Sequence, residues 1–393
     1  MIIDNAGTYT LRYTATDDCG KTTTVDRELV VAESVHVYGA EWDGSDATTW
    51  TRTDDAALFA NPSPQHSDGN GGWVGGSSPF DNLMPWSGMQ IVEDAEAGTL
   101  VSIPKFYYKW TRFGTGNVGM KLQISDKPQE GFLTSPAHAD RGDGVGERDV
   151  VYVGRYHCAS GYKSQAGVNP LANQTRATFR SGIHALGTNI WQFDFAMYWT
   201  ICMLYLVEFA DWNSQAKIGG GCSDDYSIQA MGLTDGMTYH TGTTNTVIGA
   251  TNYGHIQYRH IEDLWANVRD FCDGIYFNGA NVYGINNPSD FSDNANGTLI
   301  GQRATAVGVP KTFTDPATIT GYEYALYPST VDGTDYNTRT CDNCYYTSSG
   351  VVLAVGGIDA QSQDYGLFYL TGNYTASNKG GAFGSRLQKL PNA

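Results

Sequence analysis

Two cysteines, Cys341 and Cys344, are separated by two residues and are the first candidates for chemistry in this chain. A C-x-x-C pair binds zinc when a second pair of ligands accompanies it, and it exchanges disulfides when it opens a helix after a strand. Neither context is present around these cysteines. We therefore expect a loop disulfide or two free thiols.

Histidines and carboxylates are the next candidates, for metal binding or for acid–base catalysis. His255 and His260 flank Tyr258, but their five-residue spacing does not place two imidazoles on one face of a helix, so we expect packed or solvated histidines. A glycosidase needs two carboxylates at a defined separation, which a sequence does not give. The candidates are Glu208, Asp211, Glu262, Asp270 and Asp273, and roles at helix ends and caps are the alternative.

Motifs that define common enzyme classes are missing. The sequence contains no G-x-S-x-G elbow, no P-loop and no H-E-x-x-H pair. The Asp- and Asn-rich stretch 290–294 offers oxygen ligands for an adventitious hard cation and no more. We predict a protein that is not an enzyme and that has no catalytic residues, no cofactor and no metal site.

The segment 336–378 has the composition of a recognition surface, because Tyr, Ser, Asn and Gly dominate it. Tyr provides a large rigid contact area, and Ser and Asn adapt their hydrogen bonds to a ligand. Loops that only close a β-rich domain are the alternative. The predicted ligand-binding residues are Tyr336, Arg339, Tyr345, Tyr346, Asp359, Gln361, Gln363, Asp364, Tyr365, Asn373, Tyr374 and Asn378.

Two helices and several strands are expected to position these loops. Asn173 is the predicted cap of a first helix that ends at Gly187, and Asp194 is the predicted cap of a second. The second helix is apolar on nearly all sides, which predicts that it is buried at the centre of the domain. Residues 100–110, 120–125 and 150–156 read as strands, and 258–275 as a short helix or turn.

Length, charge and composition narrow the function further. The chain has 393 residues, a formal net charge of -17 and only 17% charged residues, with 47 Gly and 25 Tyr, so we expect a folded, strand- and loop-rich protein. The charge argues against nucleic acid as a partner. No signal peptide opens the sequence, and the longest apolar run, 195–207, is too short to insert in a membrane.

Residues 7–31 alternate polar and apolar side chains over two runs joined at 17–20, which predicts a β-hairpin. Gly7, Tyr9, Tyr13, Ala15, Asp17 and Gly20 match the last strands of a bacterial immunoglobulin-like repeat, so this stretch resembles the end of such a domain. Fewer than half of the strands of a complete domain are present. The resemblance implies that the chain is part of a longer protein with stalk modules.

The order of several later segments resembles the C-type-lectin-like fold of phage tail-fibre and receptor-binding proteins, which is also the fold of retroelement-diversified variable proteins and of formylglycine-generating enzymes. The segments are 102–110, 130–138, 150–156, 173–221, 258–275 and 366–391. In the ending AFGSRL, Arg386 matches an arginine that braces the core in that family, which implies a buried, paired guanidinium. The Glu-Pro-Asn, Gln-Pro-Asp and Trp-Asn-Asp motifs of calcium-dependent lectins do not occur.

This resemblance implies an α+β fold with two helices and small antiparallel sheets. The predicted domains are a partial immunoglobulin-like segment at 1–33, a connecting β and loop region at 34–99, and a C-type-lectin-like receptor-binding domain at 100–393. The implied function is a phage adhesin on the virion surface, whose partners are a bacterial surface receptor, either a glycan or a protein, and other virion proteins; a homo-oligomer is compatible with this role. Three alternatives stay open: a decoration protein without a specific ligand, a depolymerase, and a bacterial surface protein diversified by a retroelement.

Overall fold

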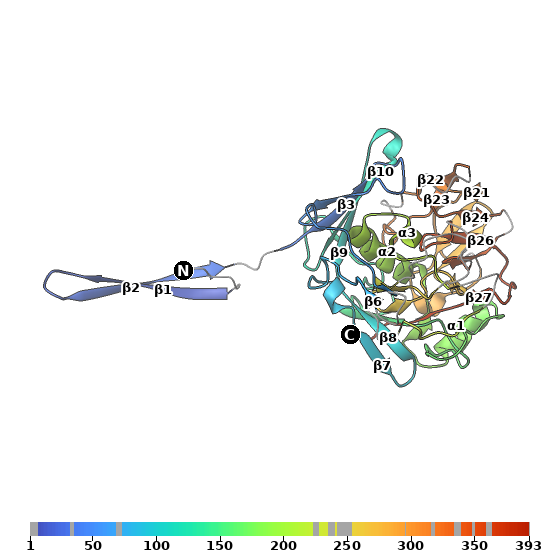
Figure 1. Cartoon of the computed structure of the whole chain (residues 1–393), viewed down its shortest axis with the longest axis horizontal. Coiled ribbons are helices and arrows are strands. Elements are labelled where there is room, and N and C mark those ends of the chain that lie inside the picture. The colour runs from blue at the N-terminus through green and yellow to red at the C-terminus, as the bar shows by residue number, and fades with distance from the viewer. Residues whose placement is uncertain are drawn as a thin grey trace.

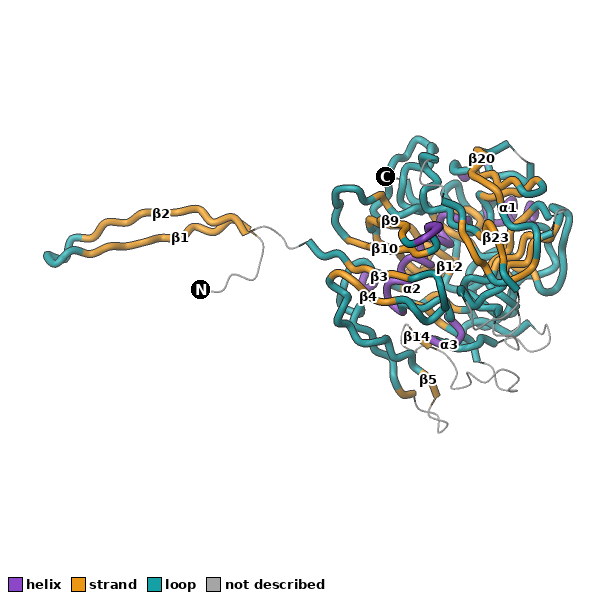
Figure 2. Tube along the Cα trace, turned by 90° about the horizontal axis from the view of Figure 1, so that it is seen from above, coloured by secondary structure: helices purple, strands orange, loops and turns teal. Residues whose placement is uncertain are grey.

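The computed structural model describes residues 7–31, 35–67, 73–222, 228–234, 240–241, 254–294, 296–315, 319–333, 339–347, 350–358 and 364–392. These residues form a long hairpin arm and a rounded body, which Figure 1 shows side by side. The hairpin projects away from the body in both views (Figures 1 and 2).

The predicted hairpin is confirmed. Strand β1 (Gly7–Thr16) pairs antiparallel with β2 (Thr22–Val31), and Thr16 lies opposite Thr22. The Asp17 carboxylate accepts hydrogen bonds from the backbone amides of Cys19 and Lys21, which holds the turn. Side chains on both faces are largely exposed, including Tyr13 and Val25. The described residues of the arm therefore form no hydrophobic core of their own.

Three larger sheets build the body. The first has the order β11 (Leu133–Thr134), β9 (Tyr107–Phe113), β10 (Gly119–Ser125), β3 (Tyr38–Trp42) and β4 (Thr51–Asp54). The second has the order β13 (Ile190–Gln192), β28 (Leu387–Lys389), β12 (Val150–Gly154), β8 (Gly98–Pro104) and β7 (Ile91–Asp94). The third has the order β21 (Val307–Gly308), β24 (Cys344–Tyr346), β26 (Leu370–Tyr374), β25 (Val352–Val355), β17 (Arg269–Cys272) and β27 (Phe383–Gly384).

Smaller sheets and short 3-10 helices complete the body. The sheets are β14 (His240–Thr241), β15 (Gln257–Tyr258) and β16 (Ile261–Glu262); β18 (Ile275–Asn278), β19 (Asn281–Gly284) and β20 (Thr298–Gln302); β22 (Pro310–Phe313) with β23 (Pro328–Val331); and β5 (His66–Ser67) with β6 (Trp73–Val74). The 3-10 helices are η1 (Trp86–Gly88), η2 (Thr115–Asn117) and η3 (Pro288–Asp290).

Helix α2 (Phe195–Phe209) lies at the centre of the body, as predicted (Figure 1). Asp194 caps it by accepting a hydrogen bond from the Met197 amide, and all of its residues are buried. The helix ends at Ala210, which has a left-handed backbone. Aromatic and aliphatic side chains of the surrounding sheets pack on it in one large core.

The remaining helices are short. Helix α1 (Arg176–His184) is capped by Thr175, whose side chain accepts from the Thr178 amide, so the prediction of Asn173 as the cap is wrong. Helix α3 (Ser214–Lys217) is a single turn capped by Asn213. Residues 258–275 contain a tight turn and the strands β16 and β17 but no helix. In the described part of the chain, no helix is long and apolar enough to cross a membrane.

The predicted α+β, C-type-lectin-like fold class is wrong. The structure is mostly β, with 36% strand and 11% helix, and the described residues contain three α-helices beside several separate small sheets. The physical reason lies in the sequence after the helices, where Gly-, Asn- and Tyr-rich segments favour turns and short strands over helices.

Candidate functional site

The structure describes part of the predicted recognition surface. Tyr336, Asp359, Gln361 and Gln363 lie outside the described residues. Tyr346 is only 1% exposed, and its ring packs against Phe277 and under the guanidinium of Arg303. Asp364 is also buried, where its carboxylate accepts from the Asn343 side-chain amide. In this structure Tyr346 and Asp364 are therefore not accessible to a ligand at the surface.

Most of the other predicted contact residues have partners within the fold. The Tyr374 hydroxyl accepts from Arg269, Arg339 donates to the Gly44 carbonyl, and Asn373 accepts from Thr371. Asn378 closes a turn by accepting from Thr375, and Tyr365 packs on Tyr369. Tyr345, which is 40% exposed, is the most accessible aromatic ring of the predicted set in the described residues. Most Tyr and Asn side chains of these loops therefore make contacts that stabilise the loops themselves.

The structure decides the predictions for the cysteine pair and for the structural arginine. Cys341 and Cys344 are buried and form no disulfide, so the thiol alternative holds for this pair. Arg386 is fully buried and donates to the backbone carbonyls of Gly154, Arg155, Glu262 and Asp263 and to the Asp270 carboxylate. The prediction of a buried, paired guanidinium is confirmed.

The five carboxylates considered for glycoside hydrolysis are all buried. Glu208 pairs with Arg259, Asp270 with His157, and Asp273 with Arg180. Asp211 pairs with Lys217, and Glu262 lies beside His255. Each carboxylate therefore has a basic partner within the fold, and none of the five lines either of the hollows described below.

A cleft of about 340 Å³ opens between strands β9 and β11 and the loop 319–324. Phe132 is its partly exposed ring, whereas Tyr108 and Tyr324 are almost completely buried beneath it. The carboxylates at its edge are Asp140, Glu147 and Glu323. Rings and polar groups that converge in an open hollow are typical of a small-molecule or glycan site. The sequence analysis missed this cleft, although 102–110 and 130–138, which contribute to it, were noted for their family resemblance.

A second hollow of about 380 Å³ adjoins the first and shares Asn286 with it. Amide and carboxylate side chains of Asn287, Asp290 and Asn296 line it, with the ring of Tyr322. Asn286 is fixed between them, because its side-chain amide donates to the Asp140 carbonyl at 3.2 Å and its side-chain oxygen accepts from Arg141 at 2.9 Å. We call the two hollows together the Asn286 cleft.

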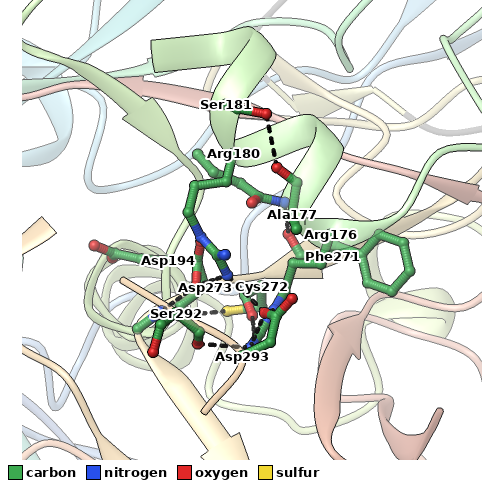
Figure 3. Close-up of polar contacts among 12 residues, drawn as sticks. Arg176, Ala177, Arg180, Ser181, Asp194, Phe271, Cys272, Asp273, Ser292 and Asp293 are labelled. Carbon is green, nitrogen blue, oxygen red and sulfur yellow. Dashed lines mark hydrogen bonds and ion pairs between the residues drawn. The ribbon is translucent and has the colours of Figure 1, made fainter. Parts of the chain in front are cut away.

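Buried ion pairs hold the wall of the Asn286 cleft in place. Figure 3 shows Arg176 and Arg180 of α1 reaching toward Asp293 and Asp273. Arg176 and Arg180 each pair with Asp293 at 2.7 Å, and Arg180 also pairs with Asp273 at 2.5 Å. Because Asp293 lies between Asp290 and Asn296, these contacts tie the second hollow to a rigid helix.

The charges at the cleft are mostly negative. Arg141, beneath Asn286, is neutralised by the buried Asp194 carboxylate at 2.8 Å. Lys105 approaches Glu147 at 3.6 Å but lies closer to Asp149, at 2.7 Å. Glu323 accepts from the Gly321 amide at 2.9 Å. An acidic ligand is thus disfavoured at the cleft edge, and a neutral or positively charged one is favoured.

One pair beneath the cleft has the residue types of a catalytic dyad. The Ser135 hydroxyl and His138 Nδ1 lie 2.7 Å apart, and His138 Nε2 lies 2.9 Å from the Ile103 carbonyl. Both side chains are completely buried, so a ligand in the cleft does not reach the hydroxyl. We interpret the pair as a structural support for the loop 134–140.

In comparisons with known proteins, no family model and no curated protein matched this chain.

Proposed function

We propose that this protein is a non-enzymatic adhesin that binds a carbohydrate in the Asn286 cleft. The observation that carries the proposal is the pair of adjoining hollows, in which the partly exposed Phe132 ring lies beside amide and carboxylate side chains. Sugar rings pack their C–H faces on aromatic rings, and their hydroxyls exchange hydrogen bonds with amide and carboxylate groups. Pre-positioned groups of this kind reduce the entropy lost on binding.

The charge of the cleft favours a particular class of carbohydrate. The carboxylates of Asp140, Glu147 and Glu323 accept hydrogen bonds from hydroxyls or from an ammonium group. They repel uronic and sialic acids. We therefore propose neutral or amino-bearing sugars as the ligands.

The setting of this activity is proposed from the sequence. The resemblance of the segments quoted above to phage receptor-binding proteins is the reason to place the protein on a virion surface and its receptor on a bacterial cell. The hairpin arm supports such a role, since an arm that projects from the body is available to join it to other modules. Many copies on a virion would strengthen weak individual contacts.

Calorimetric titration tests the proposal, with oligosaccharides of glucosamine, of N-acetylglucosamine and of glucuronic acid as the probes. We expect binding of the first two and none of the third. Glu323→Gln should weaken glucosamine binding about tenfold and leave N-acetylglucosamine binding nearly unchanged, because the substitution removes one charge-assisted contact.

The matched control is Tyr345→Ala, which removes the most accessible ring of the loops that the sequence analysis favoured. It should leave binding unchanged. Loss of binding in Tyr345→Ala, with full binding in Glu323→Gln and Asn296→Ala, would move the site to those loops. If no oligosaccharide of the set binds, and an array of bacterial glycans is also negative, the decoration role is favoured instead.

A further inference from the structure

Three ligand-type side chains meet in the interior, away from the Asn286 cleft. Among the residues that the structure describes, Cys222, His255 and Asp263 form the one group whose metal-ligating atoms all lie within 4.8 Å of one another. Asp263 Oδ2 lies 2.7 Å from His255 Nδ1 and 3.6 Å from Cys222 Sγ. All three side chains are buried. The sequence analysis expected packed or solvated histidines and no metal site, so it did not predict this group.

A tight hairpin brings His255 and Asp263 together. Strands β15 and β16 pair so that Gln257 lies opposite Glu262, and the Asp263 amide donates to the Ile256 carbonyl at 2.9 Å. The two turn residues, Arg259 and His260, both have positive φ, which matches the twist of a two-residue hairpin. This strand pairing makes residues 255 and 263 neighbours. The sequence analysis considered only the spacing of histidines along a helix, and therefore did not predict this pair.

A close backbone approach brings Cys222 to the hairpin. Gly221 has a φ of +95°, and a Cβ at this position would lie 2.2 Å from the Cβ of Ala266, so only glycine fits. The Trp265 indole donates to the Gly219 carbonyl at 3.0 Å and fixes the segment that leads to Cys222. The three ligand-type residues are therefore held by separate, well-anchored segments.

Two further side chains surround the group. Glu262 Oε1 lies 3.6 Å from His255 Nδ1. The Asn267 side-chain amide donates to Asp263 Oδ2 at 3.1 Å and orients that carboxylate. Asp263 and Asn267 both have positive φ, with values of 53° and 60°. Non-glycine residues in this region carry a conformational cost, and such residues concentrate at functional or ligand-binding positions.

We propose that Cys222, His255 and Asp263 bind one divalent zinc-type ion. Glu262 lies beside the site as a second carboxylate, and its oxygens accept hydrogen bonds from the Gly232 amide and from Thr234. Sulfur, imidazole nitrogen and carboxylate oxygen are the donors that zinc prefers, whereas calcium and magnesium prefer oxygen alone. Because all three ligand side chains are buried, we assign the ion a structural rather than a catalytic role. It ties the segment after α3 to the hairpin of β15 and β16.

Binding requires a small and balanced rearrangement. The cysteine binds as a thiolate and the histidine as a neutral imidazole, so the thiol proton and any imidazolium proton leave to solvent as the ion enters. The 2.7 Å contact between His255 and Asp263 must open to about 3.3 Å, since zinc–ligand bonds of about 2.0–2.3 Å separate tetrahedral ligands by that much. The ion then replaces the proton as the positive charge between the two carboxylates.

Cobalt binding to the full chain tests this proposal, because Co²⁺ occupies zinc sites and reports a thiolate ligand by a sulfur-to-cobalt charge-transfer band in the near ultraviolet. The protein should carry Cys19→Ser, since Cys19 is the exposed cysteine and the other six are buried. We expect one Co²⁺ per chain with this band, displacement by Zn²⁺, and a Zn²⁺-dependent rise in melting temperature.

Matched variants assign the ligands. Cys222→Ser should abolish the charge-transfer band, and Asn267→Ala should weaken binding by about tenfold or more, because orienting groups around metal ligands typically contribute that much. Cys158→Ser removes another buried thiol and should leave the charge-transfer band and the amount of bound Co²⁺ unchanged. A band that persists in Cys222→Ser, or folded Cys19→Ser protein that binds no Co²⁺ with thiolate character, would overturn the proposal. If Cys222→Ser does not fold, X-ray absorption of the cobalt-loaded Cys19→Ser protein decides whether one sulfur is bound.

Discussion

His138 illustrates how a single buried residue beneath the Asn286 cleft makes the protein sensitive to acid. Its Nε2 lies 2.9 Å from the Ile103 carbonyl, which only accepts, so Nε2 carries the proton and Nδ1 accepts from the Ser135 hydroxyl. Burial lowers the pKa of His138 to about 4, well below its ordinary value of 6.5. The folded protein therefore keeps this imidazole neutral in mild acid.

This lowered pKa predicts a loss of stability as the pH falls. Between pH 6.5 and about 4 the unfolded chain takes up a proton at His138 that the folded chain does not, so the free energy of unfolding should fall by about 3 kcal/mol over that range from this residue. Urea unfolding of the wild type and of His138→Gln at several pH values measures it. The variant should lose less stability in acid, and equal losses in both proteins would contradict this account.

At the same scale, Asp342 predicts the opposite pH dependence. Burial raises the pKa of its carboxyl to about 8, while the backbone amides of Gly366 and Phe368 donate to it. The folded chain thus holds a proton that the unfolded chain releases near pH 4, so this residue lowers stability as the pH rises from about 4 to 8. Asp342→Asn should show a smaller decline of unfolding free energy over that range. An unchanged decline would show that Asp342 is already ionised in the folded protein.

At the scale of elements, α1 is the support of the second hollow. Asp293 is contacted by both Arg176, which is fully buried, and Arg180 (Figure 3). Removing one partner of a buried ion pair leaves an uncompensated charge, which typically costs several kcal/mol. Through these ion pairs the helix holds residues 290–298 in place.

We expect Asp293→Ala to destabilise the protein by about 3 kcal/mol and to weaken oligosaccharide binding. Asp290→Ala, three residues earlier and exposed, should change the free energy of unfolding by less than about 0.5 kcal/mol. Denaturant titrations of the two variants provide the comparison. Similar stability of both would show that the α1 ion pairs do not hold this loop.

At the scale of the whole molecule, the arm and the body should behave independently. The hairpin presents exposed side chains on both faces, and an isolated two-stranded hairpin is marginally stable in water. Limited trypsin digestion should therefore cleave the arm at Arg12, Lys21 or Arg27, while the body keeps its melting temperature. Mass spectrometry and calorimetry of the digested protein measure both. A lower melting temperature after cleavage would indicate that the arm stabilises the body.

The sequence by itself determined the features that depend on neighbouring residues. The alternation of residues 7–31 specified a hairpin, and the apolar run after Asp194 specified a capped, buried helix, because both follow from local periodicity and capping. The bracing role of Arg386 was also predictable, from its family resemblance rather than from periodicity.

Only the tertiary structure decided which polar and aromatic side chains face outward and which segments meet. Tyr345 and Tyr346 are adjacent, yet one is exposed and the other is buried, since alternate residues of β24 face opposite sides of the sheet. The fold class, the Asn286 cleft and the group at Cys222 arise where segments distant in the chain pack together. Such contacts depend on the packing of the whole body, so a local sequence pattern does not predict them.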